Sequence, residues 1–244
     1  MIEWFKDWFE TDDYLEIYKH RGECEAEQLI KLILDNINLQ NNISVLDIAC
    51  GTGRHSILFA KKGFRVFSFD LSKNQIRIAK RKSTEQNLDV NFFCADVRYL
   101  SLRKKFDIIL NLFTSFGYFE DDDENFALLQ DVYNYLNDDG FFILDYFNLE
   151  YLLKNLEPKT VDLINGKVIL QERYFEGNRI NKNITIKNSS EIKTYLESVR
   201  HYNKDEILNT MKKLGFKIIT IYGDYNGNCF NKDSSKRLII FASK

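Results

Sequence analysis

The sequence predicts an α/β fold in which a smaller antiparallel segment interrupts a parallel sheet near its carboxyl end. Short apolar strands alternate with helical patterns from residue 45 to residue 146, as they do in βαβ units. From residue 160 to residue 202 apolar and charged positions alternate instead, and Asn165-Gly166 and Gly177-Asn178 supply hairpin turns. A length of 244 residues suits one such domain with an insertion.

The first βαβ unit carries the most informative motif of the chain. Residues 45–70 have the sequence VLDIACGTGRHSILFAKKGFRVFSFD, which predicts a buried strand, a glycine loop, a helix and a second strand. Gly51 and Gly53 allow the backbone to turn tightly and a ligand to approach it closely. Asp70 ends the second strand, where folds of this kind hold the ribose hydroxyls of an adenosine cofactor. The unit therefore predicts such a cofactor at the carboxyl edge of the sheet.

The motif distinguishes between two cofactors. The nicotinamide fingerprint G-x-G-x-x-G requires a third glycine where this chain has Ser56. The acid Asp47 precedes the loop instead, and the pattern resembles the first motif of class I S-adenosylmethionine (SAM) dependent methyltransferases, D-x-G-x-G-x-G, with Ala49 in place of the first glycine. The resemblance implies SAM as methyl donor and S-adenosylhomocysteine (SAH) as product. It also implies a Rossmann-like seven-stranded sheet of order 3-2-1-4-5-7-6, with helices on both faces and the last strand antiparallel.

Later segments extend the resemblance to a subgroup that methylates small molecules. In this family the acid corresponding to Asp96 binds the adenine amine, and the next backbone N–H serves a ring nitrogen; the alternative is that Asp96 only caps a turn. The string NLFTSFGYFEDDDEN, residues 111–125, lies where the fourth motif faces the methyl group. The predicted cofactor-binding residues are Tyr14, Tyr18, Arg21, Asp47, Ala49, Gly51, Thr52, Gly53, Arg54, His55, Asp70, Leu71, Asp96, Val97, Leu112 and Phe113.

The expected organisation has three parts. Residues 1–40 form an N-terminal helical lid, residues 41–157 and 203–244 form the SAM-binding core, and residues 158–202 form an inserted antiparallel appendage. The alternative for the first part is a packing helix, but Arg21 favours a lid because a guanidinium can pair with the carboxylate of SAM. We expect the appendage and residues 1–21 to form the two walls of a closed substrate pocket. The alternative is that the appendage is a β-ribbon that only packs on the core or on a second subunit.

Methyl transfer from SAM is an in-line displacement, so catalysis is mainly alignment and exclusion of water. A general base is needed only when the nucleophile must lose a proton, and the candidates are His20, Tyr118, His201 and Tyr202. The acidic run 120–124 is interpreted as the first turn of a helix, where carboxylates complement the macrodipole. No metal is expected.

Composition limits the choice of partners and compartment. A net charge of −2 and a pI near 6.0 argue against nucleic-acid binding. Four cysteines without a C-x-x-C pair, together with no signal peptide or membrane span, favour a cytoplasmic monomer or homodimer. The predicted function is transfer of a methyl group to a nitrogen, oxygen or carbon of a small molecule. Two alternatives stay open: a SAM-binding protein without transferase activity, and a nicotinamide oxidoreductase, which Ser56 and the final hairpin disfavour.

Overall fold

The apolar run after residue 43 forms β1 (Ser44–Ile48), which is buried along its whole length. It lies between β2 (Arg65–Asp70) and β4 (Phe106–Asn111), and it is parallel to both. A strand with neighbours on both sides and helices on both faces has no face exposed to solvent, which explains the apolar residues Val45, Leu46 and Ile48. The computed structural model describes residues 3–19, 22–37 and 42–244, so His20 and Arg21 lie outside the described residues.

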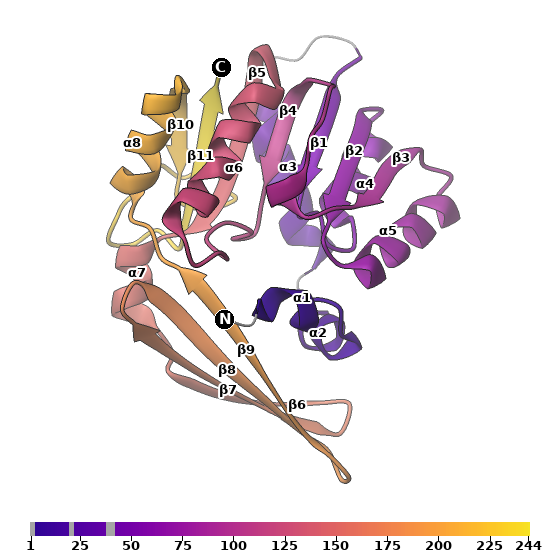
Figure 1. The fold of residues 1–244 in the computed structure, drawn as a ribbon, viewed down its shortest axis with the longest axis vertical. Coiled ribbons are helices and arrows are strands. Elements are labelled where there is room, and N and C mark those ends of the chain that lie inside the picture. The colour runs from indigo at the N-terminus through magenta and orange to yellow at the C-terminus, as the bar shows by residue number, and fades with distance from the viewer. Residues whose placement is uncertain (1–2, 20–21, 38–41) are drawn as a thin grey trace.

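The large sheet has seven strands in the order β10-β11-β5-β4-β1-β2-β3 (Figure 1). Its remaining strands are β3 (Val90–Cys94), β5 (Leu136–Phe147), β10 (Lys217–Tyr222) and β11 (Arg237–Ser243). The strands β1 to β5 are parallel, whereas β11 runs antiparallel to both β5 and β10. The predicted order 3-2-1-4-5-7-6 with an antiparallel last strand is therefore confirmed.

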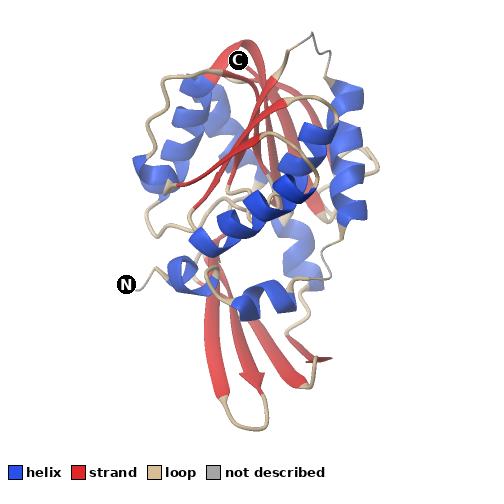
Figure 2. Cartoon of the chain, turned by 90° about the vertical axis from the view of Figure 1, so that its right-hand side faces the viewer, coloured by secondary structure: helices blue, strands red, loops and turns tan. Residues whose placement is uncertain are grey.

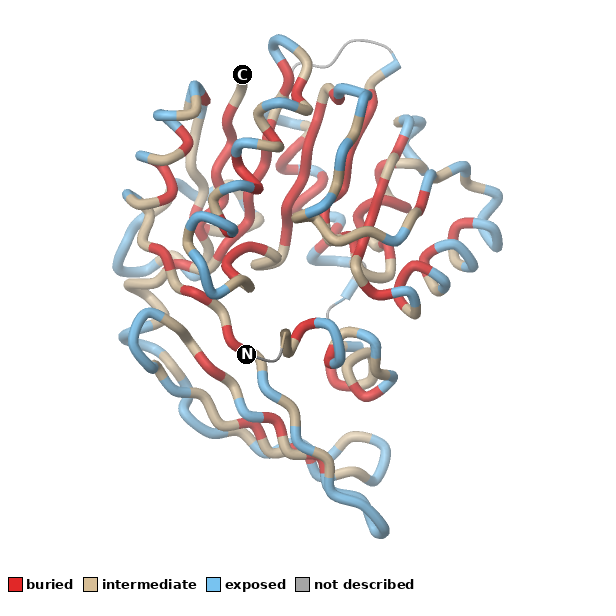
Figure 3. Tube along the Cα trace, viewed as in Figure 1, coloured by how far each residue is buried: buried red, intermediate tan, exposed pale blue. Residues whose placement is uncertain are grey.

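Helices cover both faces of this sheet. The helices α3 (Glu23–Asn36) and α4 (Arg54–Lys61) contribute to one apolar cluster, and α6 (Asp122–Tyr135) and α8 (Lys204–Leu214) contribute to the other. The helix α5 (Lys73–Glu85) packs against β2 and β3, and a short 3₁₀ turn, η1 (Val97–Tyr99), follows β3. Figure 3 shows the buried strands enclosed between these helices.

Two local features differ from the sequence prediction. The sequence pattern predicts the fifth strand over residues 141–146, but β5 begins earlier, at Leu136 directly after α6, and shifts its pairing with β4 before Phe141. The helix α7 (Leu149–Asn155) was not predicted. Leu149, Leu152 and Leu153 have helical spacing, but none of the residues of this short helix is buried.

The segment after α7 forms a second sheet of four strands, in the order β6-β7-β8-β9. Its strands are β6 (Lys159–Ile164), β7 (Lys167–Glu176), β8 (Arg179–Lys187) and β9 (Ile192–Arg200), and every pair is antiparallel. Asn165 and Gly166 both have positive φ, 49° and 78°, as the predicted two-residue hairpin turn requires.

Two short N-terminal helices lie between the large sheet and the small one (Figures 1 and 2). They are α1 (Trp4–Trp8) and α2 (Asp12–Ile17). Trp8 and Ile17 join a buried cluster with Ile169, Ile184 and Ile186 of the small sheet. The helices therefore share their apolar core with the small sheet rather than with the large one. Over the part of the chain that the structure describes, no helix has the length and apolar character needed to cross a membrane.

Candidate active site

Two adjoining cavities lie at the carboxyl edge of β1, β2 and β4. The larger cavity has a volume of about 600 Å³ and the smaller cavity about 110 Å³. They share part of their lining, so they form one continuous site. The shared residues are Phe9, Tyr14, Ala49, Gly51, Gln75, Ser115 and Tyr118.

The structure gathers nearly all of the predicted cofactor-binding residues here. The larger cavity is lined by Tyr14, Tyr18, Asp47, Ala49, Gly51, Thr52, Arg54, His55, Leu112 and Phe113. The smaller cavity is lined by Tyr14, Ala49, Gly51, Asp70, Leu71, Asp96 and Val97. Gly53 lines neither cavity but caps the start of α4, and Arg21 lies outside the described residues.

The glycine loop repeats a left-handed backbone at alternate residues. Ala49, Gly51 and Gly53 have φ of 56°, 57° and 77°. Ala49 thus adopts the conformation for which glycine is the usual residue, at the position where the resembled motif has glycine. A Cβ on Gly53 would stand 2.7 Å from the ring of Phe92, so the close packing of α4, α5 and β3 excludes any side chain there.

Asp70 holds this loop against the end of β2. Its carboxylate accepts hydrogen bonds from the backbone N–H of Gly51 at 2.8 Å and of Ser72 at 2.9 Å. Burial raises the pKa of Asp70. An ionised carboxylate offers about four acceptor positions, so two remain for hydroxyl donors in the smaller cavity.

Asp96 caps a turn and also lies at the smaller cavity. It caps η1 by accepting the N–H of Arg98. The Arg98 guanidinium donates two further bonds to Asp96, at 3.1 and 2.6 Å, and pairs with Glu3 at 2.5 Å. Burial by itself would raise the pKa of Asp96, but the bonds from Arg98 hold that pKa below its usual range. Its predicted bond to adenine stays a prediction.

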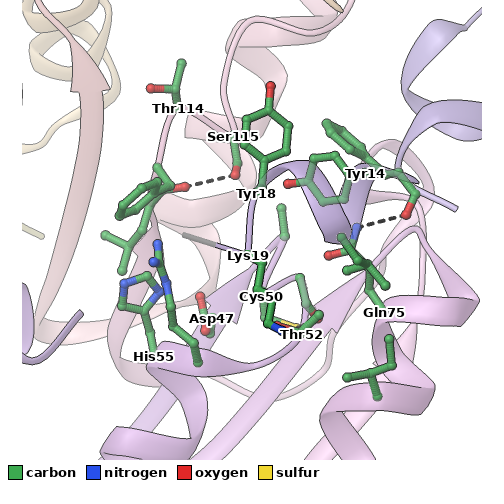
Figure 4. Close-up of a pocket in the computed structure, with 18 of the residues that line it drawn as sticks. Tyr14, Tyr18, Lys19, Asp47, Cys50, Thr52, His55, Gln75, Thr114 and Ser115 are labelled. Carbon is green, nitrogen blue, oxygen red and sulfur yellow. Dashed lines mark hydrogen bonds between the residues drawn. The ribbon is translucent and has the colours of Figure 1, made fainter. Parts of the chain in front are cut away.

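Two buried titratable groups lie at the inner wall of the larger cavity (Figure 4). Asp47 accepts a hydrogen bond from Ser56 Oγ at 2.6 Å, and burial raises its pKa to about 7. His55 is 6% exposed, and burial lowers its pKa to about 3. Its Nε2 finds no hydrogen-bond partner within the described ranges. The site therefore presents a neutral imidazole with an unsatisfied nitrogen, which fits a ligand rather than an apolar core.

The outer wall of the larger cavity comes from both N-terminal helices and the small sheet. Tyr14 and Tyr18 of α2 line it, and so does Glu197 of β9. Glu197 accepts hydrogen bonds from Tyr18 Oη at 2.6 Å and Trp8 Nε1 at 2.7 Å, and it pairs with Lys182 at 2.5 Å. Sequence reasoning missed Glu197, although an acid between Tyr195 and Val199, on one face of an alternating strand, was a visible signal.

A second set of contacts ties the N-terminal segment to α5. The Glu10 carboxylate accepts from Ser72 Oγ at 2.5 Å and from the Asn74 N–H at 3.1 Å. Ser72 and Gln75 have the sequence spacing of a capping box, which is half formed: Ser72 accepts the N–H of Gln75, but the Gln75 side chain donates to the Phe9 carbonyl instead. The sequence could not reveal this, because Phe9 is far away in the chain.

The candidate general bases do not all lie at the cavities. Tyr118 lines both cavities. His201 and Tyr202 line neither, because β9 ends at Arg200 and the chain turns away toward α8. Tyr202 is 1% exposed and donates to Asp122, and His201 packs on Phe175 with a pKa lowered by burial. His20 lies outside the described residues.

The predicted acidic run begins α6 as expected. Asp121 caps the helix by accepting the N–H of Asp123 at 2.8 Å, and Asp122 to Glu124 form the first turn. Among the residues that the structure describes, no cluster of His, Cys, Asp and Glu could hold a metal ion.

Comparison with known proteins agrees with this geometry. Residues 45–140 match the family described as "Methyltransferase domain". The chain is 26% identical over 237 residues to a glycine/sarcosine N-methyltransferase of Parasynechococcus marenigrum (strain WH8102), covering 95% of this chain and 82% of that protein. It is also 26% identical over 246 residues to a glycine/sarcosine N-methyltransferase of Aphanothece halophytica, covering 99% and 90%.

A solved structure shows the same fold. It is a S-adenosylmethionine-dependent methyltransferase from Clostridium acetobutylicum ATCC 824, which superposes with a TM-score of 0.79 at 23% identity and covers 95% of this chain and 96% of that one. The glycine loop, the acids at the ends of β2 and β3 and the sheet order agree with the family match. The chain therefore belongs to the class I SAM-dependent methyltransferases and uses SAM as its methyl donor.

Proposed function

We propose that this methyltransferase transfers the methyl group of SAM to the amine nitrogen of a small molecule. One observation carries the proposal: the larger cavity continues beyond the glycine loop into a space walled by α2 and β9. Its volume of about 600 Å³ lies in the range typical of small-ligand sites. Adenosine would occupy the smaller cavity beside Asp70, and the methionine part and the acceptor would share the larger one.

The walls explain why the acceptor is small. The N-terminal helices are tied to β9 through Glu197 and to α5 through Glu10, so both sides of the segment are anchored. A polymer would need an open cleft with a basic surround, because phosphate contacts dominate nucleic-acid affinity. The net charge of −2 gives no such surround. The small sheet and the N-terminal helices thus serve as the two walls of the acceptor pocket.

Two features favour an amine over a hydroxyl acceptor. The carboxyl group of Asp47 lines the larger cavity, whereas Glu197 is already paired with Lys182, and a carboxylate favours a group that is cationic before it reacts. The two curated relatives that cover nearly all of this chain are named N-methyltransferases of glycine and sarcosine. A neutral amine attacks with its own lone pair and needs no base during the transfer step.

SAM, when bound, supplies an activated methyl group that the acceptor nitrogen attacks in line with the carbon–sulfur bond. The chain's contribution is alignment and exclusion of water. Asp70 orients the ribose, the neutral His55 offers an unprotonated nitrogen or an N–H to the ligand, and the rings of Tyr14, Tyr18 and Tyr118 shield the reacting atoms. An acceptor that binds as an ammonium loses one proton to water before attack; the neutral nitrogen then takes the methyl group, and the methylated amine leaves as an ammonium beside SAH.

The test uses matched acceptors that differ at one group. The protein is incubated with methyl-labelled SAM and either glycine, sarcosine or glycolate, in which a hydroxyl replaces the amine of glycine. We expect label on an amine and none on glycolate. Transfer to glycolate alone would contradict the amine assignment, and transfer to RNA in a parallel reaction would contradict a small-molecule acceptor.

A further inference from the structure

We propose that Asp145, together with Arg237 and Tyr225, is a positioning network that fixes the Phe113–Thr114 wall of the methyl-transfer cavity. None of the three network residues lines either cavity. They act through the two wall residues, which both line the larger cavity. The inference rests on the proposed function, because a fixed wall matters for rate only if transfer takes place beside it.

The wall has an unusual backbone. Phe113 and Thr114 follow the end of β4 with φ of 59° and 63°, so two successive residues with side chains adopt the left-handed region. This region is costly for bulky and β-branched residues, and it persists only where the surrounding structure enforces it. Strained residues of this kind concentrate at functional sites. The strain therefore requires an anchor.

Asp145 of β5 is that anchor, and it holds both residues. Its Oδ2 accepts the Phe113 N–H at 3.0 Å, and its backbone carbonyl accepts the Thr114 N–H at 2.9 Å. Its side chain is fully buried. A buried carboxylate without a compensating charge would be unstable, so a cation must accompany it.

Arg237 of β11 supplies the charge and a further contact to the wall. Its Nε donates to Asp145 Oδ1 at 2.7 Å, and its Nη2 donates to Thr114 Oγ1 at 3.2 Å. The guanidinium therefore connects the anchor to the side chain of the wall. A lysine could keep the charge but not this fork of donors.

The ring of Phe113 is fixed as well. Tyr225 donates to Asp145 Oδ2 at 2.8 Å and stacks on Phe113, with ring centroids 6.1 Å apart. The Arg54 guanidinium stands 4.0 Å from the centroid of the Phe113 ring. Asp145 and Tyr225, which both lie outside the cavity, thus set the backbone and the ring of Phe113, which is how a site is pre-organised on rigid strands.

The test variant is Asp145→Asn. The amide keeps the size of the side chain. In one orientation its NH2 donor faces the Phe113 N–H donor, and in the other it replaces the oxygen that accepts from Arg237. Two readouts follow the wall. One is kcat and KM with the amine acceptor that the wild-type protein uses. The other needs no acceptor: the ratio of calorimetric affinities for SAH and for the SAM analogue in which CH–NH2 replaces S–CH3.

We expect SAH affinity within about threefold of wild type, because the network does not contact the adenosine cavity. We expect kcat to fall by about 100-fold, the loss typical of a 1 Å misplacement, with a smaller change in KM. The ratio of the affinity for SAH to the affinity for the SAM analogue should change by about tenfold relative to wild type. Arg237→Lys, which keeps the charge, is the second variant and should lower kcat by about tenfold, so the test survives if Asp145→Asn folds poorly.

The matched control is Asp107→Asn. Asp107 is a partly buried acid that accepts hydrogen bonds from the N–H and the Oγ–H of Ser44, both at 2.8 Å, at the opposite end of β4. It should lower the melting temperature without moving kcat or the affinity ratio. Asp145 variants that behave like this control would overturn the inference. Wild-type protein that binds neither ligand would contradict the proposed function itself.

Discussion

Removing the Asp70 carboxylate tests how the glycine loop and the cofactor depend on one side chain. In the free protein this carboxylate accepts the N–H of Gly51 and of Ser72, at 2.8 and 2.9 Å. In the complex we expect it also to accept both ribose hydroxyls. Asp70→Ala therefore removes two interactions from folding and two more from binding.

The two losses have separable magnitudes. An unsatisfied buried N–H costs about 1–3 kcal/mol, and water in the cavity reduces the cost to the low end, so the unfolding free energy should fall by about 2 kcal/mol. For a chain of this size the melting temperature should then fall by about 4–8 °C. Two charge-assisted bonds to the ribose are worth about 3–6 kcal/mol, so the dissociation constant of SAH should rise by about 10²- to 10⁴-fold.

The assay combines calorimetry with SAH and a thermal melt of the free protein. The control is Asp89→Ala, which removes an exposed acid just before β3 and should change neither value. An Asp70→Ala protein whose SAH affinity stays within about threefold of wild type would refute the ribose assignment. A variant that melts like wild type would show that the loop does not need the carboxylate.

The remaining predictions concern pH, the N-terminal helices and the choice of cofactor. Burial raises the pKa of Asp47 from 3.8 to about 7, so the folded state binds more protons across that range and stability falls as pH rises, by about 1.4 kcal/mol per pH unit at most. Burial lowers the pKa of His55 from 6.5 to about 3, so stability rises with pH across that range. In urea unfolding series, Asp47→Asn should therefore steepen the rise of the unfolding free energy with pH between about pH 4 and 6.5, whereas His55→Gln should turn that rise into a fall. Variant pH profiles that run parallel to the wild-type profile would contradict both pKa assignments. Glu197→Gln leaves the Lys182 ammonium, whose side chain is 15% exposed, without its counter-charge. The variant should loosen α1 and weaken SAH binding about tenfold, a loss of about 1.4 kcal/mol. Tryptophan fluorescence reports the loosening of α1 directly, because both tryptophans of the chain lie in α1. The control Glu172→Gln, at a side chain that is 47% exposed, should change neither the fluorescence nor the SAH affinity. SAH at about a hundred times its dissociation constant should stabilise the fold by about 2.7 kcal/mol and raise the melting temperature by about 5–11 °C, whereas NADH should have no effect; the opposite pattern would contradict the cofactor.

The sequence predicted the cofactor side of the site because its residues follow strand ends in order. Asp47, Asp70, Asp96 and Leu112 each stand in or just after one of four parallel strands, and parallel strands bring their carboxyl ends to one edge. The positions of these residues along the sequence therefore predict that they lie together at one edge of the sheet. The hairpin turns were predictable for a related reason, since Asn165-Gly166 satisfies its backbone requirement locally.

The acceptor side depends on contacts that no local pattern encodes. Glu197 meets Trp8 across 189 positions of the chain, and Arg237 meets Asp145 across 92. Tyr202 was a candidate base because it follows a strand, but the chain turns after β9 so that Tyr202 lies in the apolar core. Such residues are identified only when the packing of separate segments is known.

The central claim is that these two cavities bind SAM and deliver its methyl group to a small molecule. The most direct measurement follows the methyl-labelled donor in a cell extract, with the protein added and the low-molecular-mass and macromolecular fractions then separated and analysed by mass spectrometry. The account predicts SAH and a labelled small molecule in equal amounts, and loss of both with Asp70→Ala. Label that remains on SAM, or that enters only protein or nucleic acid, would contradict it.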